Sequence, residues 1–270
     1  MIVDIQFSPA AEPWESLRSG VQLAEACGFD TAFVFDHFAG KLLRGHTMLE
    51  CFALLGAMAG STSEIGIGTL VVNVANRNPG VMAMGAASVQ AISRGRLVLG
   101  LGAGAAPNTS WSAEHRELGL HIEPTMALRH ARLGAALDEI DRLWHPGRSA
   151  ALASFPTVTP RPPVILGVNS VPLARMAAER TDGFNVRSSH ERLDDLVTVA
   201  REARSASDRA ADPMTVSVWA EWDEALADPD HPSRRRWSDL GVNRVVLVWL
   251  RPHDPASMTR FAEAAGLGQR

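Results

Sequence analysis

The amino-acid sequence predicts a (β/α)8 TIM barrel, in which eight parallel strands form a cylinder surrounded by helices. Short β-branched or apolar runs alternate with longer amphipathic stretches, and about eight such pairs occur in the 270 residues. This alternation requires parallel strand pairing, and eight units close a barrel of roughly 250 residues. No stretch has the composition of a linker, so we expect one domain spanning residues 1–270.

The expected strands share a nearly continuous apolar character, typical of parallel strands covered on both faces. They are Ile2–Phe7, Thr31–Phe35, Ile65–Val72, Leu97–Leu101, Pro163–Leu166, Gly183–Val186, Thr215–Trp219 and Arg244–Trp249. Residues 220–240 contain Pro229 and Pro232, so the helix in this part is expected to be short or broken. Residues 145–161 are rich in Pro, Gly, Ser and Ala, which predicts one long loop.

Charge and cysteine content exclude several classes of protein. The chain has 26 basic and 30 acidic residues, which argues against a partner that is nucleic acid or an anionic membrane. The two cysteines form no disulfide framework, and no His or Cys spacing indicates a metal site. No apolar run reaches the roughly 18 residues that a membrane span needs. We therefore expect a cytoplasmic enzyme that acts on a small molecule.

Polar residues follow the expected strands. In barrels of this kind, the catalytic and binding residues lie at these carboxyl ends of the strands. Asp36 and His37 come after the second strand and Asn73 after the third. A histidine can exchange a proton near neutral pH, and a nearby carboxylate can fix its tautomer. A structural role for this histidine is the alternative interpretation. Adjacent residues at a strand end point in different directions, so Asp36 and His37 need not touch each other.

Two glycine turns follow the fourth and fifth strands. The run Gly100–Gly104 lets the backbone approach a ligand closely, and Gly167–Ser170 opens a helix with Ser170 as its expected N-cap. A single glycine more often serves only to permit a turn. Two glycine turns on neighbouring strands, however, favour a phosphate-binding site. Gly100–Ala105 partly matches a dinucleotide fingerprint, but its position after the fourth strand argues against NAD.

Other candidate residues are more ambiguous. Trp219 and Trp249 lie near strand ends and are expected to line a flat hydrophobic pocket. Glu114 and His115 fall in a stretch interpreted as a loop or surface helix. The chain has no G-x-S-x-G turn, which argues against a serine hydrolase.

Several of these motifs, taken in order, resemble the luciferase-like flavin monooxygenase superfamily. They are Phe33–Phe38, Ile67–Asn73, Arg77–Pro79, Ser93–Gly104, Pro163–Ser170 and Arg180–Asn185. The resemblance covers nearly the whole chain and implies a luciferase-like barrel that binds a flavin or deazaflavin at its mouth. Asp-His after the second strand is more similar to the branch that uses coenzyme F420, a deazaflavin, than to the FMN-dependent branch.

The resemblance also implies roles for individual residues. Asp36 would contact the deazaflavin ring and His37 would handle the proton, with Asn73 near the ring. A non-proline cis peptide is implied between Leu70 and Val71. The residues implied along the ribityl-phosphate tail are Gly102, Ala103, Gly104, Gly167, Val168, Asn169 and Ser170.

The sequence departs from the sugar-phosphate dehydrogenases of this branch at two places, and from the family at a third. Ala105 and Ala106 stand where those enzymes carry an acidic residue, and Gly40-Lys41 stands where they carry a tryptophan. Residues 149–161 take the place of a longer insertion in the family. The sequence therefore does not identify the segment that would cover the site. Oxidation of a sugar phosphate is therefore not supported by the residues, and the substrate is unidentified.

The function that the resemblance implies is hydride transfer between coenzyme F420 and a small organic substrate. The first alternative is an FMN-dependent monooxygenase that receives reduced flavin from a partner reductase. A non-catalytic member that has lost its cofactor is the second alternative, and an NAD-dependent dehydrogenase is the most distant one. The resemblance also implies a homodimer.

Overall fold

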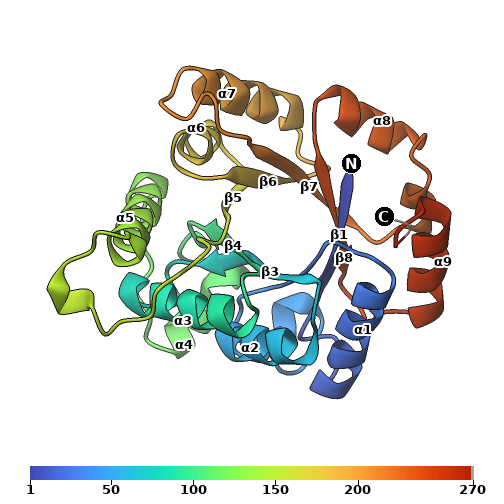
Figure 1. The fold of residues 1–270 in the computed structure, drawn as a ribbon, viewed down its shortest axis with the longest axis horizontal. Helices are drawn as coiled ribbons and strands as arrows, with labels where there is room; N and C mark the ends of the chain where they lie inside the picture. Colours follow the sequence, from blue (N-terminus) through green and yellow to red (C-terminus); the bar gives the residue numbers. More distant parts are fainter. Residues whose placement is uncertain (269–270) are drawn as a thin grey trace.

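The computed structural model describes residues 1–268 and contains a closed barrel of eight parallel strands that pair in chain order (Figure 1). The strands are β1 (Ile2–Phe7), β2 (Thr31–Val34), β3 (Gly66–Asn73), β4 (Leu97–Gly102), β5 (Val164–Val168), β6 (Gly183–Arg187), β7 (Thr215–Glu221) and β8 (Arg244–Trp249). The barrel closes where β1 pairs with β8, in register from Ile2 with Arg244 to Phe7 with Trp249. The predicted fold is therefore confirmed.

Helices cover the outside of the barrel (Figure 1). They are α1 (Trp14–Ala26), α2 (Cys51–Ser61), α3 (Pro79–Ile92), α4 (Ala113–Glu117), α5 (Met126–Trp144), α6 (Val171–Arg180), α7 (Leu193–Ser205), α8 (Pro232–Asp239) and α9 (Pro255–Ala265), with 3-10 turns at Gly40–Leu43, Ser110–Ser112, Ala150–Leu152 and Glu224–Ala227. The β7–β8 connection holds only a 3-10 turn and the short α8, as its prolines predicted. Residues 145–161 are a loop interrupted by one 3-10 turn. None of the helices within residues 1–268 has both the length and the hydropathy needed to cross a membrane.

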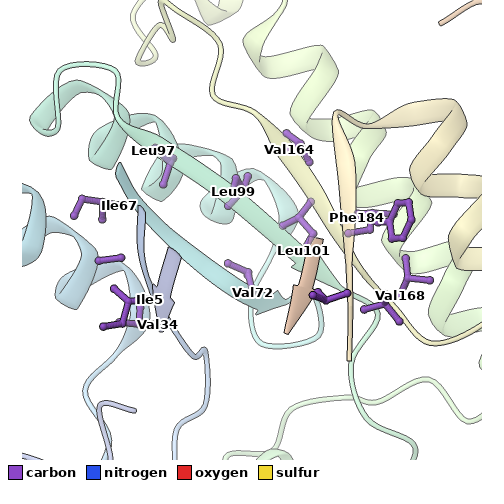
Figure 2. Packing of buried hydrophobic residues seen from close by; sticks show 14 of the residues in the cluster. Ile5, Val34, Ile67, Val72, Leu97, Leu99, Leu101, Val164, Val168 and Phe184 are labelled. Carbon is purple, nitrogen blue, oxygen red and sulfur yellow. The ribbon is translucent and has the colours of Figure 1, made fainter. Parts of the chain in front are cut away.

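Two apolar clusters lie on opposite faces of the strands, because successive side chains of a strand alternate between faces. The larger cluster fills the space between the barrel and its helices and includes Ile5, Leu99 and Phe184 (Figure 2). The smaller one fills the interior and consists of Phe33, Leu70, Ile165 and Val246. Side chains thus occupy the inside of the barrel, and a ligand can enter only at its ends.

The amino end of the barrel is closed by a buried polar contact between Asp4 and Arg244. The Asp4 Oδ1 atom accepts a hydrogen bond of 2.8 Å from the Arg244 guanidinium, which also contacts Asp30 at 2.8 Å. Asp4 lies on β1 and Arg244 on β8, so this contact ties the two strands at the closing seam. The carboxyl end is different, because it opens into a cavity.

Candidate active site

A cavity of about 690 Å³ lies at the carboxyl ends of the strands. Its wall includes eleven of the twelve residues that the sequence assigned to the site. These are Asp36, His37, Leu70, Val71, Asn73, Gly102, Ala103, Gly104, Gly167, Val168 and Asn169. Asp36, His37 and residues of the two glycine turns therefore line one hollow.

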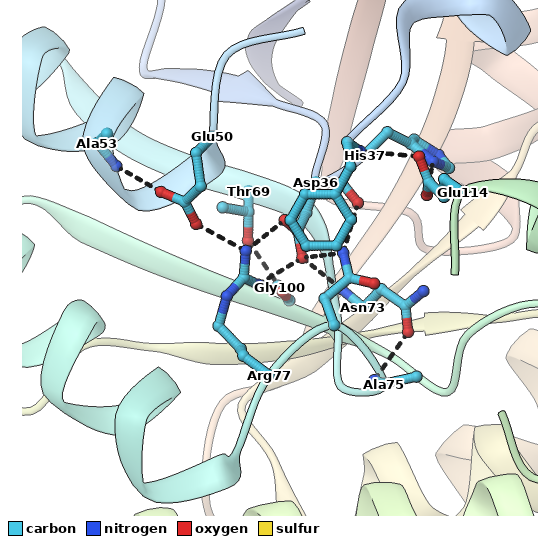
Figure 3. A network of polar contacts seen from close by, with 12 residues as sticks. Asp36, His37, Glu50, Ala53, Thr69, Asn73, Ala75, Arg77, Gly100 and Glu114 are labelled. Carbon is cyan, nitrogen blue, oxygen red and sulfur yellow. Dashed lines mark hydrogen bonds and ion pairs between the residues drawn. The ribbon is translucent and has the colours of Figure 1, made fainter. Parts of the chain in front are cut away.

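Asp36 anchors the loop between β3 and α3. Its two oxygens accept hydrogen bonds of 2.7 and 2.8 Å from Arg77, and one also accepts from the Asn73 amide and the Asn76 side chain (Figure 3). The Asp36 side chain is 1% exposed, so the ion pair is buried. Protein groups therefore hold both oxygens in place, while the expected contact of Asp36 with a cofactor ring stays a prediction.

His37 is held by Glu114, which reaches it from α4 (Figure 3). The His37 Nδ1 atom lies 2.8 Å from Glu114 Oε1, and Glu114 Oε2 accepts hydrogen bonds from the backbone amides of Phe38 and Ala39. Burial raises the pKa of Glu114, but these hydrogen bonds outweigh burial, so the pKa lies below its ordinary value. Glu114 is therefore a buried carboxylate of the site, and its interpretation as a surface residue was wrong.

His115, the next residue of α4, holds Asn73. The Asn73 Nδ2 atom donates to His115 Nε2 at 3.2 Å, while Asn73 Oδ1 accepts from the Ala75 amide. Because Nε2 accepts, the proton of the neutral ring is on Nδ1, which is buried without a partner among the described residues. Burial lowers the pKa of His115, which favours this neutral form. The surface placement expected for His115 was wrong as well.

A chain of hydrogen bonds fixes the peptide between Leu70 and Val71. This peptide is cis, as the resemblance implied. The Gln6 side chain donates to the Leu70 carbonyl at 2.7 Å and accepts from the Trp219 indole at 2.9 Å. Gln6 lies on β1 and links β3 with β7 through the barrel interior. Trp219 lines the cavity as predicted, beneath the Arg187 guanidinium.

The glycines at the ends of β4 and β5 make room for Val71. A Cβ atom on Gly102 would lie 2.5 Å from the Val71 Cγ2 atom, and one on Gly167 would lie 3.1 Å from Cγ1. Gly104 has a positive φ of 81°, which favours glycine. These positions thus need glycine for the packing of the cavity wall, whatever ligand the backbone amides meet.

Two residues differ from their predicted roles. Ser170 is the N-cap of α6, but its hydroxyl caps no backbone amide and it does not line the cavity. Instead, its Oγ atom is buried without a partner among residues 1–268. Trp249 does not line the cavity either, because it stacks on Trp222 at 4.5 Å between ring centroids. Trp249 points outward because it alternates with its inward-facing neighbours along β8.

The cavity wall also carries charged residues that sequence reasoning did not assign. They are Arg44, Arg129, His130, Arg187 and Glu221. Arg187 and Glu221 end β6 and β7, and that position was a signal that could have identified them. Arg44 and Arg129 come from a loop and from α5, where no strand end marks them. No three His, Cys, Asp or Glu side chains of the described chain gather as metal ligands.

Comparison with known proteins supports the same fold. The chain is 28% identical to the F420-dependent glucose-6-phosphate dehydrogenase of Beutenbergia cavernae, over 96% of this chain and 77% of that protein. It is 28% identical to the 5,10-methylenetetrahydromethanopterin reductase of Methanolobus tindarius, over 82% of this chain and 64% of that protein.

Solved structures with the same architecture include two F420-dependent enzymes. One is an F420-dependent secondary alcohol dehydrogenase in complex with an F420-acetone adduct, with a TM-score of 0.76, 17% identity and coverage of 98% of this chain and 99% of that one. The other is the coenzyme F420-dependent tetrahydromethanopterin reductase of Methanopyrus kandleri, with a TM-score of 0.75, 15% identity and coverage of 97% of both chains. The luciferase-like monooxygenase family model matches residues 4–231. The chain therefore belongs to the luciferase-like monooxygenase family.

Proposed function

We propose that the protein is an F420-dependent oxidoreductase that transfers a hydride between the deazaflavin and a small organic substrate. The observation that carries the proposal is the single cavity that joins His37 to the two glycine turns. The names of the relatives support F420 over FMN, because the dehydrogenase and the two solved enzymes are described as F420-dependent. The substrate is unassigned, since Ala105 and Ala106 replace the acidic residue expected of a sugar-phosphate dehydrogenase.

The residues present fit such a cofactor. The cavity volume lies within the range of about 300–1,000 Å³ that is usual for ligand sites. The amino end of α6 offers backbone amides to an anionic group, next to Val168 and Asn169 of the cavity wall. Arg44 and Arg129 add positive charge to the wall, which suits the anionic tail of F420. Asn73, Leu70 and Val71 would lie along the ring.

The bound cofactor would supply the chemistry of a two-electron hydride carrier. The chain's own contribution is to orient the substrate, exclude water and move one proton. His37 lines the cavity beside Trp111, with 5.5 Å between their ring centroids, and its side chain is 21% exposed. We assign the proton transfer to His37.

Titration of the purified protein with F420 and with FMN, followed by the absorbance of each ring, tests the cofactor. We expect F420 to bind at micromolar concentration and FMN to bind more weakly. Tighter binding of FMN would favour the monooxygenase alternative, and binding of neither would favour a non-catalytic protein. Oxidation of a panel of alcohols and sugar phosphates, read as reduction of F420, then identifies the substrate class.

The variant His37→Ala tests the proton transfer. We expect turnover to fall by about 10²-fold or more, while the F420 dissociation constant changes little, because general acid-base catalysis contributes on this scale. Unchanged turnover on the substrate found in the panel would remove the role assigned to His37.

We also propose that two copies of the chain associate through α2 and α3, which pack side by side. Neither helix contains a charged residue, although Ala57, Val81 and Ile92 are exposed. A surface helix without a polar face is normally covered. Light scattering during gel filtration should give a dimer, and Ala57→Arg should give a monomer. A monomeric wild-type chain would contradict this proposal.

A further inference from the structure

Glu114 has only hydrogen-bond donors around its carboxylate. One oxygen lies 2.8 Å from His37 Nδ1, and the other lies 2.8 Å from the Phe38 amide and 2.9 Å from the Ala39 amide. The Glu114 side chain is 3% exposed. The two backbone amides can only donate, so Glu114 Oε2 must accept. This atom is therefore either a carboxylate oxygen or the carbonyl oxygen of a protonated acid. A buried carboxylate with donors on both oxygens is ionised.

An ionised Glu114 determines which nitrogen of His37 carries the proton. The atom that faces a carboxylate oxygen at 2.8 Å must donate, so Nδ1 carries the hydrogen. Nε2 has no hydrogen-bond partner within residues 1–268, and the ring lines the cavity. The neutral ring therefore presents the lone pair of Nε2 as its free acceptor.

We propose that Glu114 is a positioning residue that fixes His37 in the Nδ1–H tautomer, so that Nε2 exchanges the proton with the substrate. The part of this inference that concerns catalysis rests on the proposed function. When a hydroxyl group is oxidised, its proton would pass to Nε2 while the carbon gives its hydride to the bound deazaflavin, which leaves the carbonyl product. In the reverse direction, the doubly protonated ring returns that proton from Nε2 to the oxygen. Glu114 keeps its negative charge in both states and stabilises the charged ring.

The carboxylate that contacts His37 does not come from the residues directly after the glycine turn. Ala105 and Ala106 occupy that place. The carboxylate instead comes from α4, a helix of five residues that packs Glu114 against His37 and His115 against Asn73. One short helix thus sets the orientation of two polar residues of the cavity wall.

The tautomer can be measured without any cofactor or substrate. Long-range nitrogen-proton NMR spectra of the full-length protein distinguish Nδ1–H from Nε2–H, and the His37→Gln spectrum assigns the signals of this ring. We expect Nδ1–H in the wild type. In Glu114→Gln, the two amides retain the side-chain oxygen and the NH2 group turns toward Nδ1, so we expect Nε2–H.

Glu117→Gln is the matched control, because it places the same substitution at an exposed position of the same helix. It should keep the wild-type tautomer. A wild-type ring protonated at Nε2, or a Glu114→Gln ring unchanged from the wild type, would overturn the inference. If Glu114→Gln does not fold, the wild-type spectrum alone decides the matter.

Kinetics provide the second measurement. Glu114→Gln should lower kcat by about 10²-fold, with KM and the F420 dissociation constant changed by less than about threefold, because only proton transfer is affected. Equal losses in F420 affinity and kcat would indicate a merely structural role. If F420 does not bind the wild type, the proposed function fails, whereas the expected tautomer would still support the positioning role of Glu114.

Discussion

Asp36 and His37 are neighbours in the chain, but each is held by a partner from a different direction. Arg77 holds Asp36 from the loop after β3, and Glu114 holds His37 from α4. The two side chains make no contact with each other among the hydrogen bonds of the described residues, which agrees with the divergence expected at a strand end. Asp36 and His37 therefore take part in two separate polar contacts, one that holds the loop after β3 and one that orients the His37 ring.

The ion pair between Arg77 and Asp36 should be important for stability. Replacement of Arg77 by Met would leave the Asp36 carboxylate buried without its counter-charge, so we expect a loss of about 3–5 kcal/mol of unfolding free energy. Urea denaturation monitored by tryptophan fluorescence measures this loss.

Glu50→Gln is the control for this prediction, because Glu50 contacts the same Arg77 but its side chain is 45% exposed. An exposed pair contributes about 1 kcal/mol or less. The double variant Asp36→Asn, Arg77→Met should recover part of the lost stability. A loss in Arg77→Met no larger than that in Glu50→Gln would contradict the importance of the buried pair.

Elements with strong apolar patterns could be predicted from the sequence, whereas short polar elements could not. All eight strands lie within two residues of their expected bounds, because a buried parallel strand is marked by a continuous apolar run. The five residues of α4 have no such periodicity, since Glu114 and His115 are buried by polar contacts rather than by packing of an apolar face. Polar burial is a tertiary effect, so the local sequence carries no signal for it.

The contact between β3 and β4 at the cavity depends on the absence of a side chain at residue 102. In Gly102→Ala, the new methyl group would overlap the Val71 side chain, so we expect a loss of about 1–3 kcal/mol of stability from overpacking. Adding Val71→Ala to this variant should restore most of the lost stability. It removes the clashing Cγ2 atom and leaves the Cβ atom of residue 71, which lies 3.5 Å from the new methyl group. Thermal denaturation of both variants checks the prediction, and an equally unstable double variant would argue against this clash.

The two ends of the barrel differ in what they hold. The cavity lies at the carboxyl ends of the strands, which is the end where barrels of this kind carry their active sites. The amino end holds the buried contact between Asp4 and Arg244 at the closing seam. This contact was not predicted, because its residues are 240 positions apart and meet only when the barrel closes.

The amino end should make the stability of the barrel depend on pH. The pKa of Asp4 is raised to about 7, because burial, with a smaller contribution from the charge of Asp30, outweighs the opposing effect of Arg244. The ordinary value of 3.8 applies to the unfolded chain. Because the folded pKa is the higher one, this group's contribution is complete below pH 4 and is lost as pH rises through 7. The loss between pH 6 and pH 8 should be about 1.4 kcal/mol.

Urea denaturation of the wild type and of Asp4→Asn at pH 6 and pH 8 isolates this contribution, since the amide does not titrate. The wild type should lose about 1.4 kcal/mol more than Asp4→Asn over this interval. Asp195→Asn, at an exposed carboxylate of α7, should follow the wild type. If Asp4→Asn retains the full pH dependence of the wild type, Asp4 is ionised throughout this interval. In that case Arg244 would offset the cost of burying Asp4, and the seam would be held by a permanent ion pair instead.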